Sequence, residues 1–279
     1  MLAMKPEDMQ EFEIHQLLEA IYFRYGYDFR DYSKASLERR ILHRVQQSDL
    51  NSISEMVPRV MHETAFFELF LRDMSVTVTE MFRDPKVFKK LRQEVFIQLK
   101  TYSRVNIWHA GCATGEEVYS MAIMLKEEGL LERTRIYATD YNNHSLDIAK
   151  KGIYPAEKMQ SYTESYLAAG GKASFADYYQ AKFGSAKMAE SLKEHITFAN
   201  HNLMKDQAFA EMHLIVCRNV LIYFNPKLQD KVLALFKESL IARGFLLLGD
   251  KETIDFSEVK TSFETFSKKE RIFRRKMYV

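Results

Sequence analysis

The chain has 279 residues, of which 47% are hydrophobic and 28% charged, a composition that is ordinary for a globular protein and excludes a disordered or collagen-like chain. Its 40 basic and 38 acidic side chains nearly balance, so no global charge points to a nucleic-acid-binding protein. At ~100–200 residues per domain we expect one large or two modest domains. Two are favoured, because residues 1–85 hold 10 basic and 15 acidic side chains while residues 86–279 hold 30 and 23.

Residues 1–84 predict a small helical N-terminal domain. Apolar residues recur at helical spacing in successive stretches within residues 7–73, and no strand signal of comparable strength occurs there. Ser33 is placed to cap the second of these helices. Ser52 and Glu55 have the spacing of a capping box before the third.

Residues 85–279 predict an α/β domain. One amphipathic helix runs to about Leu99, and short apolar strands then alternate with helices, which is typical of a parallel sheet with helices on both faces. Residues 153–195 fit this alternation poorly and are expected to be an insertion. The expected strands are 105–110, 135–139, 196–199, 214–217, 245–248, 263–266 and 271–278, and the expected helices are 116–128, 145–151 and 226–244.

The chain has only two cysteines, Cys112 and Cys217, which by themselves can form neither a disulfide framework nor a zinc site. The first thirty residues lack the apolar core of a signal peptide. No stretch approaches the ~18 uncharged apolar residues of a membrane span. We therefore expect a cytoplasmic protein that binds no metal and does not insert into the membrane.

The most informative stretch joins the first expected strand to the next helix and reads Trp108-His-Ala-Gly-Cys-Ala-Thr-Gly-Glu-Glu117. Ligands of open α/β sheets bind at the carboxyl ends of strands, and Gly111 and Gly115 let the backbone approach a ligand closely. Glu116 and Glu117 would repel a pyrophosphate at the helix start. They suit a ligand with a cationic part, such as S-adenosylmethionine, although either could serve only the helix dipole, worth ~0.3–1 kcal/mol.

The second expected strand ends in an acid, Asp140. Nucleotide-type folds bind ribose hydroxyls with an acid at this strand end, and an ionised carboxylate accepts hydrogen bonds from two neighbouring hydroxyls. We therefore expect Asp140 to bind a ribose. The alternative is that Asp140 caps the helix that starts near Asn143.

The fourth expected strand ends in Cys217-Arg218-Asn219 and continues as Val-Leu-Ile-Tyr-Phe224. Polar residues directly after an apolar strand should lie in the ligand cleft. The Asn/Asp-Pro-Pro-aromatic run of adenine-modifying transferases is absent. Cys217 lacks the preceding proline of cytosine C5 transferases, so we expect a buried strand thiol there, and Phe224 is expected in the core.

These motifs together resemble those of the CheR-type chemotaxis receptor glutamate methyltransferases. The resemblance covers nearly the whole chain, and its last run is the most specific. It departs from the family at Thr77, Ala113 and Val118, where the family usually has Asn, Ser and Pro. The matching runs are Thr77-Val-Thr79-Glu-Met-Phe-Arg83, Gly111-Cys-Ala-Thr-Gly-Glu-Glu-Val-Tyr-Ser120, Thr139–Asp140, Asn202–Leu203 and Cys217 to Phe224.

The resemblance implies a Rossmann-like class I methyltransferase sheet behind a helical substrate-recognition domain. It implies S-adenosyl-L-methionine as the cofactor and S-adenosyl-L-homocysteine as its product. Arg83 and Tyr223 would lie near the transferring methyl and are the catalytic candidates. With the glycine turn included, the residues expected to bind the cofactor are Thr77, Thr79, Arg83, Gly111, Glu116, Asp140, Asn202, Leu203, Arg218 and Asn219.

The resemblance also implies a basic, receptor-facing helix that carries Arg39, Arg40 and Arg44. Helical spacing places Arg40 and Arg44 one turn apart on the same face. We expect the apolar residues of this helix, Leu37, Ile41 and Val45, to take the opposite side. Family members often carry a small β-insertion that docks receptors, and residues 153–195 lie at the corresponding place.

The expected reaction is methyl transfer to glutamate side chains of chemoreceptor cytoplasmic helices. A glutamate of pKa ~4.3 is already ionised at neutral pH, so the absence of an obvious general base is consistent with it. The alternative is a catalytically weak CheR-like module that binds S-adenosylmethionine or S-adenosylhomocysteine as a sensor. An RNA or small-molecule methyltransferase lacks support, because no aromatic and basic strand suggests base stacking. We expect a monomer without a nucleic-acid partner.

Overall fold

The computed structural model describes residues 6–75 and 79–277, and the chain divides into two compact units. The first unit comprises Met1–Val76 and Ile222–Gln229, and the second comprises Thr77–Leu221 and Asp230–Val279. The sequence of the second unit is therefore interrupted once, by the segment Ile222–Gln229, which belongs to the first unit.

The first unit is helical over its described residues, as the sequence predicts. Ser33 stands directly before the second helix, but its side chain makes no capping hydrogen bond. No capping box precedes the third helix, because Glu55 instead accepts a hydrogen bond from the backbone N–H of Asn51 at 3.2 Å. The helices are α1 (Pro6–Tyr25), α2 (Lys34–Gln47), α3 (Met56–His62) and α4 (Thr64–Met74).

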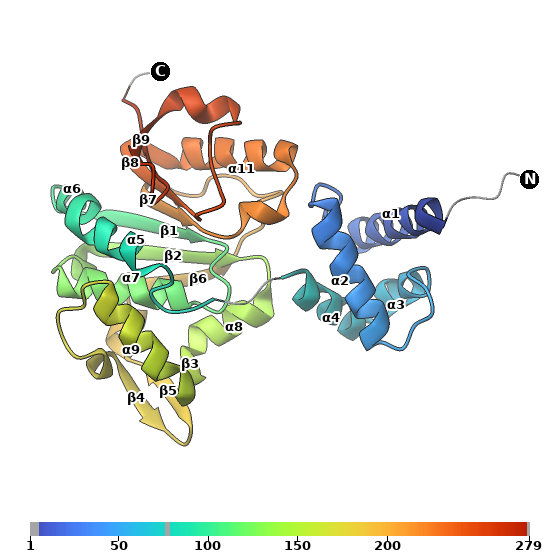
Figure 1. Ribbon diagram of the computed structural model, residues 1–279, viewed down its shortest axis with the longest axis horizontal. Helices are drawn as coiled ribbons and strands as arrows, with labels where there is room; N and C mark the ends of the chain where they lie inside the picture. Colours follow the sequence, from blue (N-terminus) through green and yellow to red (C-terminus); the bar gives the residue numbers. More distant parts are fainter. Residues whose placement is uncertain (1–5, 76–78, 278–279) are drawn as a thin grey trace, which may run out of the picture. The chain divides into compact units, whose positions relative to one another are not determined.

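The second unit is built on a seven-stranded sheet in the order β6-β2-β1-β7-β8-β10-β9 (Figure 1). The first five strands are parallel and follow the 3-2-1-4-5 order of doubly wound sheets, while β10 is antiparallel to both neighbours. The predicted α/β fold class is therefore confirmed. The strands are β1 (Val105–Ala110), β2 (Thr134–Asp140), β6 (Ile196–Asn200), β7 (Met212–Cys217), β8 (Leu240–Leu248), β9 (Phe263–Ser267) and β10 (Ile272–Arg275).

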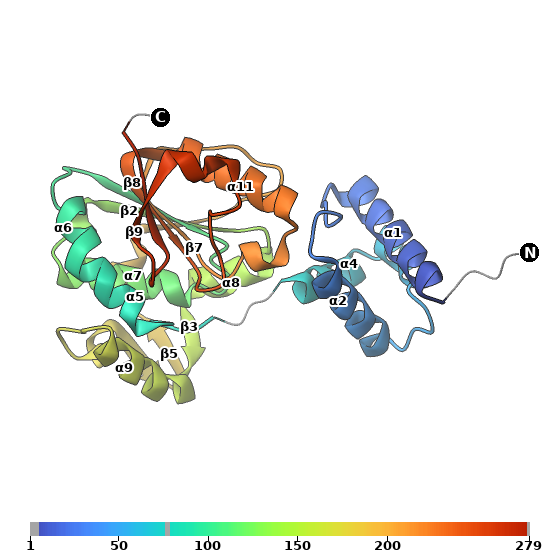
Figure 2. The ribbon, with the colours of Figure 1, turned by 45° about the horizontal axis from the view of Figure 1, so that its top comes forward.

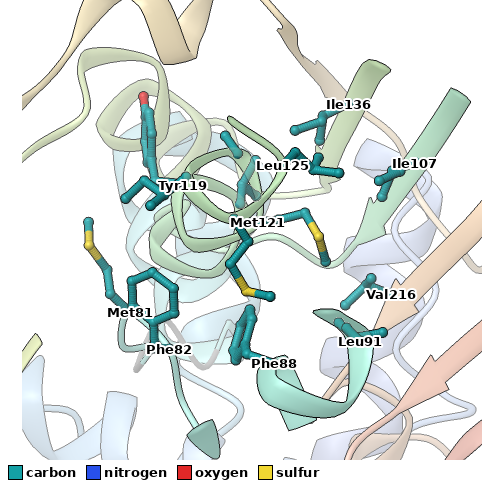
Figure 3. Close-up of a cluster of buried hydrophobic side chains, with 14 of the residues drawn as sticks. Met81, Phe82, Phe88, Leu91, Ile107, Tyr119, Met121, Leu125, Ile136 and Val216 are labelled. Atoms are coloured by element: carbon teal, nitrogen blue, oxygen red, sulfur yellow. The ribbon is translucent and has the colours of Figure 1, made fainter. Parts of the chain in front are cut away.

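Helices cover both faces of this sheet (Figures 1 and 2). On one face, Ile107 and Val216 of the sheet share a buried core with Leu91 and Met121 (Figure 3). On the other face, the Trp108 ring meets Phe236 with 5.4 Å between ring centroids. The helices are α5 (Pro85–Lys90), a π-helical turn (Leu91–Val95), α6 (Phe96–Leu99), α7 (Glu116–Glu127), α8 (Asn143–Lys151) and α11 (Pro226–Ser239).

The helix after Asn225 begins as predicted but ends early. Asn225 Oδ1 accepts a hydrogen bond from the Leu228 N–H at 2.9 Å, and Pro226 occupies the first helical position. The prediction that this helix reaches Gly244 is wrong, because β8 already begins at Leu240. The extra residues of that strand are absorbed by an irregular register in its pairing with β7.

Residues 153–195 contain a small antiparallel sheet that the sequence pattern did not reveal. Its strands pair in the order β3-β5-β4, with bounds Ile153–Pro155, Ser185–Met188 and Tyr179–Lys182. Strands of three or four residues are too short to show a period of two. Helices α9 (Met159–Ala168) and α10 (Glu190–Lys193) complete the region.

None of the helices in residues 6–75 and 79–277 is both long enough and apolar enough to cross a membrane.

Candidate cofactor site

The turn between β1 and α7 requires glycine at two positions. Gly111 and Gly115 have φ angles of 77° and 91°, in the left-handed region that favours glycine. A Cβ atom at Gly115 would lie 2.9 Å from the Cβ of Ala149 on α8 and 3.3 Å from the hydroxyl of Tyr154. Tyr154 belongs to the insertion and donates a hydrogen bond to the Thr114 carbonyl at 2.8 Å. The insertion therefore helps to hold the turn.

Asp140 fastens this turn from the end of β2. Its Oδ2 accepts from the Ala113 N–H at 2.9 Å and its Oδ1 from the Asn142 N–H at 2.9 Å. Burial raises the pKa of Asp140, and these backbone hydrogen bonds oppose the rise. They occupy only part of the acceptor capacity of a carboxylate. The cap of α8 is Asn142, whose Oδ1 accepts from the N–H groups of His144 and Ser145, so the alternative role of Asp140 as a helix cap is wrong.

Glu116 is buried on the first turn of α7, with 4% of its surface exposed. Its Oε2 accepts a hydrogen bond from the Thr114 hydroxyl at 2.6 Å. Burial raises the pKa of Glu116 to about 7, a rise that Lys158 opposes and Glu80 supports. No ion pair to Glu116 occurs among residues 6–75 and 79–277. A cationic group of a ligand would therefore find an acceptor here.

Glu117 has entirely different partners. Its Oε2 accepts a hydrogen bond from Arg218 Nη1 at 2.6 Å, and its Oε1 lies 3.5 Å from His109 Nδ1. Burial acts to raise the pKa of Glu117, but Arg218 and His109 outweigh it and hold the value at about 2. Glu117 is committed to an internal ion pair, whereas Glu116 is not.

Arg218, at the end of β7, uses its guanidinium inside the protein. Besides Glu117, its Nη1 donates to the Arg83 carbonyl at 3.2 Å, and its Nη2 donates to the Asp84 carboxylate. Only 2% of the side chain is exposed. Arg83 itself is half-buried, and its guanidinium forms no ion pair with any residue that the structure describes.

Asn202 and Asn219 lie in ordered loops after β6 and β7. The Asn202 N–H donates to Asp206 Oδ2 at 2.7 Å, and Asn202 Oδ1 accepts from the Met204 N–H at 3.0 Å. Asn219 has a left-handed backbone, with φ of 60°, which asparagine tolerates. Leu203, between Asn202 and Met204, is buried.

Glu252 carries no motif, yet it holds the loop after β7. Its buried carboxylate accepts hydrogen bonds from the N–H groups of Gly249 at 2.6 Å, Asn219 at 3.0 Å, Val220 at 2.8 Å and Leu221 at 2.7 Å. Burial raises the pKa of Glu252, and these bonds oppose the rise. The signal that could have found it is its place just after the apolar strand β8, the same criterion that singled out Arg218.

Most predicted cofactor residues lie at or just after the carboxyl ends of four adjacent strands, β6, β2, β1 and β7. Asn202, Asp140, Gly111 and Asn219 are the respective examples. Thr79 is half-buried near the start of the second unit, and Thr77 lies outside the described residues. The cofactor-contact roles of all these residues remain predictions.

The prediction that Arg40 and Arg44 lie on the side of α2 opposite its apolar residues is wrong. The buried residues of this helix are Leu37, Arg40, Ile41, Arg44 and Val45. Their spacing of i, i+3, i+4, i+7 and i+8 is that of a single core-facing stripe. Arg40 and Arg44 therefore share the apolar face instead of opposing it, and only Arg39 of the three is exposed.

Both buried arginines bind groups of the first unit. Arg44 pairs with the Asp73 carboxylate, and Arg40 donates a hydrogen bond to the Met74 carbonyl. The Arg40 guanidinium also lies 4.5 Å from the ring centroid of Tyr223, in a cation–π contact. The half-buried Tyr223 thus packs within the first unit, and its placement near the transferring methyl stays a prediction.

The site combines a doubly wound sheet, a turn with two left-handed glycines and an acid at the end of the second strand. It also holds a buried glutamate, Glu116, that has no cationic partner among the described residues. This combination fits S-adenosylmethionine. It defines a Rossmann-like methyltransferase. Two family models agree with this class: residues 77–272 match the CheR methyltransferase S-adenosylmethionine-binding domain, and residues 13–75 match the CheR methyltransferase all-alpha domain. The chain belongs to the CheR methyltransferase family, and its second unit is an S-adenosylmethionine-binding domain.

Several curated relatives match over most of their own length. A Pseudomonas putida protein, provisionally named methyltransferase Cher3, is 53% identical over 272 residues, covering 98% of this chain and 100% of that protein. A chemotaxis protein methyltransferase of Borreliella burgdorferi is 30% identical over 87% of this chain and 88% of that protein. Chemotaxis protein methyltransferase 2 of Pseudomonas aeruginosa is 29% identical over 86% of each.

Proposed function

We propose that this methyltransferase esterifies glutamate side chains on the cytoplasmic helices of a chemoreceptor. The observation that carries the proposal is Arg83, a half-buried arginine at the start of the cofactor-binding unit without an ion-pair partner among the described residues. A planar guanidinium can hold a carboxylate in two parallel hydrogen bonds. Relatives named as chemotaxis protein methyltransferases support the choice of substrate.

The chain's own task in this reaction is alignment. The acceptor glutamate, of pKa ~4.3, is already ionised at neutral pH and needs no general base. S-adenosylmethionine supplies the electrophilic methyl group on its sulfonium. Orienting two reactants can contribute several kcal/mol, up to ~7–11 in ideal cases. Arg83 orients the acceptor carboxylate through its planar guanidinium.

The cofactor's parts would meet different residues. Asp140 accepts hydrogen bonds from the ribose hydroxyls, and Glu116 forms an ion pair with the ammonium group. The rest of the site is lined by Thr79, Asn202, Leu203 and Asn219. The substrate reaches the enzyme through the exposed Arg39 of α2 and through the three-stranded insertion, which stands where family members carry a receptor-docking element.

The proposed reaction is tested by the chemistry of the product. The purified chain, incubated with methyl-labelled S-adenosylmethionine and a bacterial lysate, should label protein, and mild base should release the label because methyl esters hydrolyse readily. Asp140→Ala, which removes the proposed ribose acceptor, serves as the blank. Label that a nuclease removes would mean an RNA substrate. Cofactor binding without any label would favour the sensor module instead.

Cofactor affinity should depend on pH through Glu116. With a pKa of about 7 in the free protein, this carboxyl is mostly protonated below pH 7 and must lose its proton to pair with the ammonium. Binding therefore releases a proton, and affinity should rise by about an order of magnitude between pH 5.5 and 7.5. Isothermal titration calorimetry at several pH values measures this rise.

Glu116→Gln is the control for that pH dependence. It keeps the side chain's size and an acceptor for Thr114 but cannot ionise, so affinity should be lower and nearly flat over the same range. An equally steep rise in the Glu116→Gln variant would assign the proton to another group, of which Asp140 is the nearest candidate because burial also raises its pKa.

A further inference from the structure

The short segment that carries Arg83 has an uncommon backbone. Phe82 and Asp84, on either side of Arg83, have φ angles of 54° and 58°, in the left-handed region. Residues other than glycine rarely adopt it. Such conformations are strained and persist only when the surrounding structure imposes them. The contacts that impose this turn are therefore informative about Arg83.

The first half of the turn is held by α7 and the core. The Phe82 N–H donates to Ser120 Oγ at 2.9 Å, and that hydroxyl donates to the Glu116 carbonyl at 2.8 Å. The Phe82 ring is fully buried and packs edge-on against Phe88 (Figure 3). It also packs edge-on against Tyr166.

The second half of the turn is held by Arg218 alone among the charged side chains described. Its two terminal nitrogens bind the Arg83 carbonyl and the Asp84 carboxylate. Glu117 fixes Arg218 in turn, at 2.6 Å, and His109 of β1 lies 3.5 Å from Glu117. A chain of charged and polar groups thus runs from β1 through α7 and β7 to the Arg83 turn.

We infer that Arg218 is a positioning residue for Arg83, which it serves by fixing the left-handed turn between Phe82 and Asp84. Both terminal nitrogens of Arg218 are already used by the protein, so its contribution to methyl transfer runs through Arg83 and not through the cofactor contact that the family resemblance implies for it. This inference rests on the proposed function, because it takes Arg83 as the group that orients the acceptor carboxylate. A lysine cannot replace Arg218, because one ammonium cannot reproduce the planar fork that spans Glu117, Asp84 and the Arg83 carbonyl.

Arg92 offers a matched control. Like Arg218, it has a largely covered side chain, 8% exposed, that binds two carboxylates, Glu127 at 2.5 Å and Glu128 at 3.1 Å. Its Nε has no described partner. One of its partners, Glu127, ends α7, the helix on which Glu117 lies near the start. Arg92 makes no hydrogen bond to the Arg83 turn among the contacts of the described residues.

Arg218→Lys and Arg92→Lys should separate positioning from structural support. Both should lower the melting temperature, but only Arg218→Lys should slow single-turnover methylation at saturating S-adenosylmethionine, by at least about tenfold, since misplacement by ~1 Å can cost ~100-fold. Calorimetric affinity for S-adenosylmethionine should change less than about threefold in both. Equal turnover in the two variants would overturn the inference. If Arg218→Lys instead lost enough affinity for S-adenosylmethionine to explain its slower turnover, Arg218 would be a cofactor ligand and the inference would be wrong.

A second variant, Asp84→Gly, tests the inference if Arg218→Lys does not fold. A second measurement, hydrogen exchange, tests it if the wild type shows no methylation. Asp84→Gly tolerates the left-handed backbone but removes the carboxylate that Arg218 holds, so turnover should fall as in Arg218→Lys. Hydrogen exchange should show lost protection at residues 82–84 in Asp84→Gly and Arg218→Lys but not in Arg92→Lys. Unchanged protection at these residues would overturn the inference, whether or not the wild type is active. Failure of the wild type to methylate glutamate would overturn only the proposed function.

Discussion

Arg83→Lys should bind S-adenosylmethionine nearly as well as the wild type but transfer the methyl group about 100-fold more slowly or worse, a loss typical of removing one well-placed hydrogen-bond donor. Lysine keeps the charge of Arg83 but not the planar fork that holds a carboxylate in two hydrogen bonds. The product is a neutral ester, so the charge-assisted contact weakens after the reaction and release is favoured. Single-turnover methylation at saturating cofactor measures the chemical step directly.

The alternative role of Arg83 is a purely structural ion pair. The absence of such a pair among the described residues argues against it, and Arg92→Lys supplies a reference for a lost structural pair. If Arg83→Lys turned over at the wild-type rate but melted at a clearly lower temperature, the catalytic assignment of Arg83 would have to be withdrawn.

The position of the site could be predicted from the sequence because the rule that places it is local. Parallel strands end at one edge of their sheet, so residues just after an apolar run meet there whatever the loops do. This rule predicts Gly111, Asp140 and Asn219, and the structure places Asp140 as the last residue of β2 and the other two just after β1 and β7. The left-handed angles of Gly111 and Gly115 agree with the predicted turn.

What the two adjacent glutamates do could not be predicted, because it depends on contacts that are distant in sequence. Consecutive residues of a helix point about 100° apart, so Glu116 and Glu117 face different surroundings. Arg218, 101 residues away, lowers the pKa of Glu117. Burial without such a partner raises that of Glu116. For the same reason the sequence could not predict the hydrogen bonds from Arg218 to Asp84 and to the Arg83 carbonyl, which are 134 and 135 residues away.

The error on α2 has a different origin, because the decisive signal was local. Leu37, Ile41 and Val45 fit one helical stripe, and so do Arg40 and Arg44, which fill its i+3 and i+7 positions. The prediction treats the charge of an arginine as evidence that its side chain is exposed. Arginine can nevertheless be buried where carboxylates, carbonyls and aromatic rings take up its donors and charge. In α2 these partners are Asp73, the Met74 carbonyl and the ring of Tyr223.

Charge reversal at Arg40 and Arg44 should therefore unfold the helical unit before it changes substrate binding. Removing one partner of a buried ion pair costs ~3–5 kcal/mol, and glutamate at position 44 would also stand beside Asp73. Denaturant unfolding of the full chain should show Arg44→Glu destabilised on this scale, and Arg40→Glu should also be destabilised because it sets a buried carboxylate against the Met74 carbonyl. Arg39→Glu, on the exposed side of the same helix, should stay within ~0.5 kcal/mol of the wild type.

The same three variants decide where on α2 an acidic receptor helix could bind. If docking uses the exposed side, Arg39→Glu should raise the KM for receptor at low salt, where charge effects are strongest, and leave stability and cofactor affinity unchanged. If Arg40→Glu and Arg44→Glu instead gave stable, folded proteins with a raised KM for the receptor, these two arginines would be free to bind it. Their burial against the first unit predicts the opposite, because side chains already committed to Asp73, Met74 and Tyr223 have few donors left for a partner.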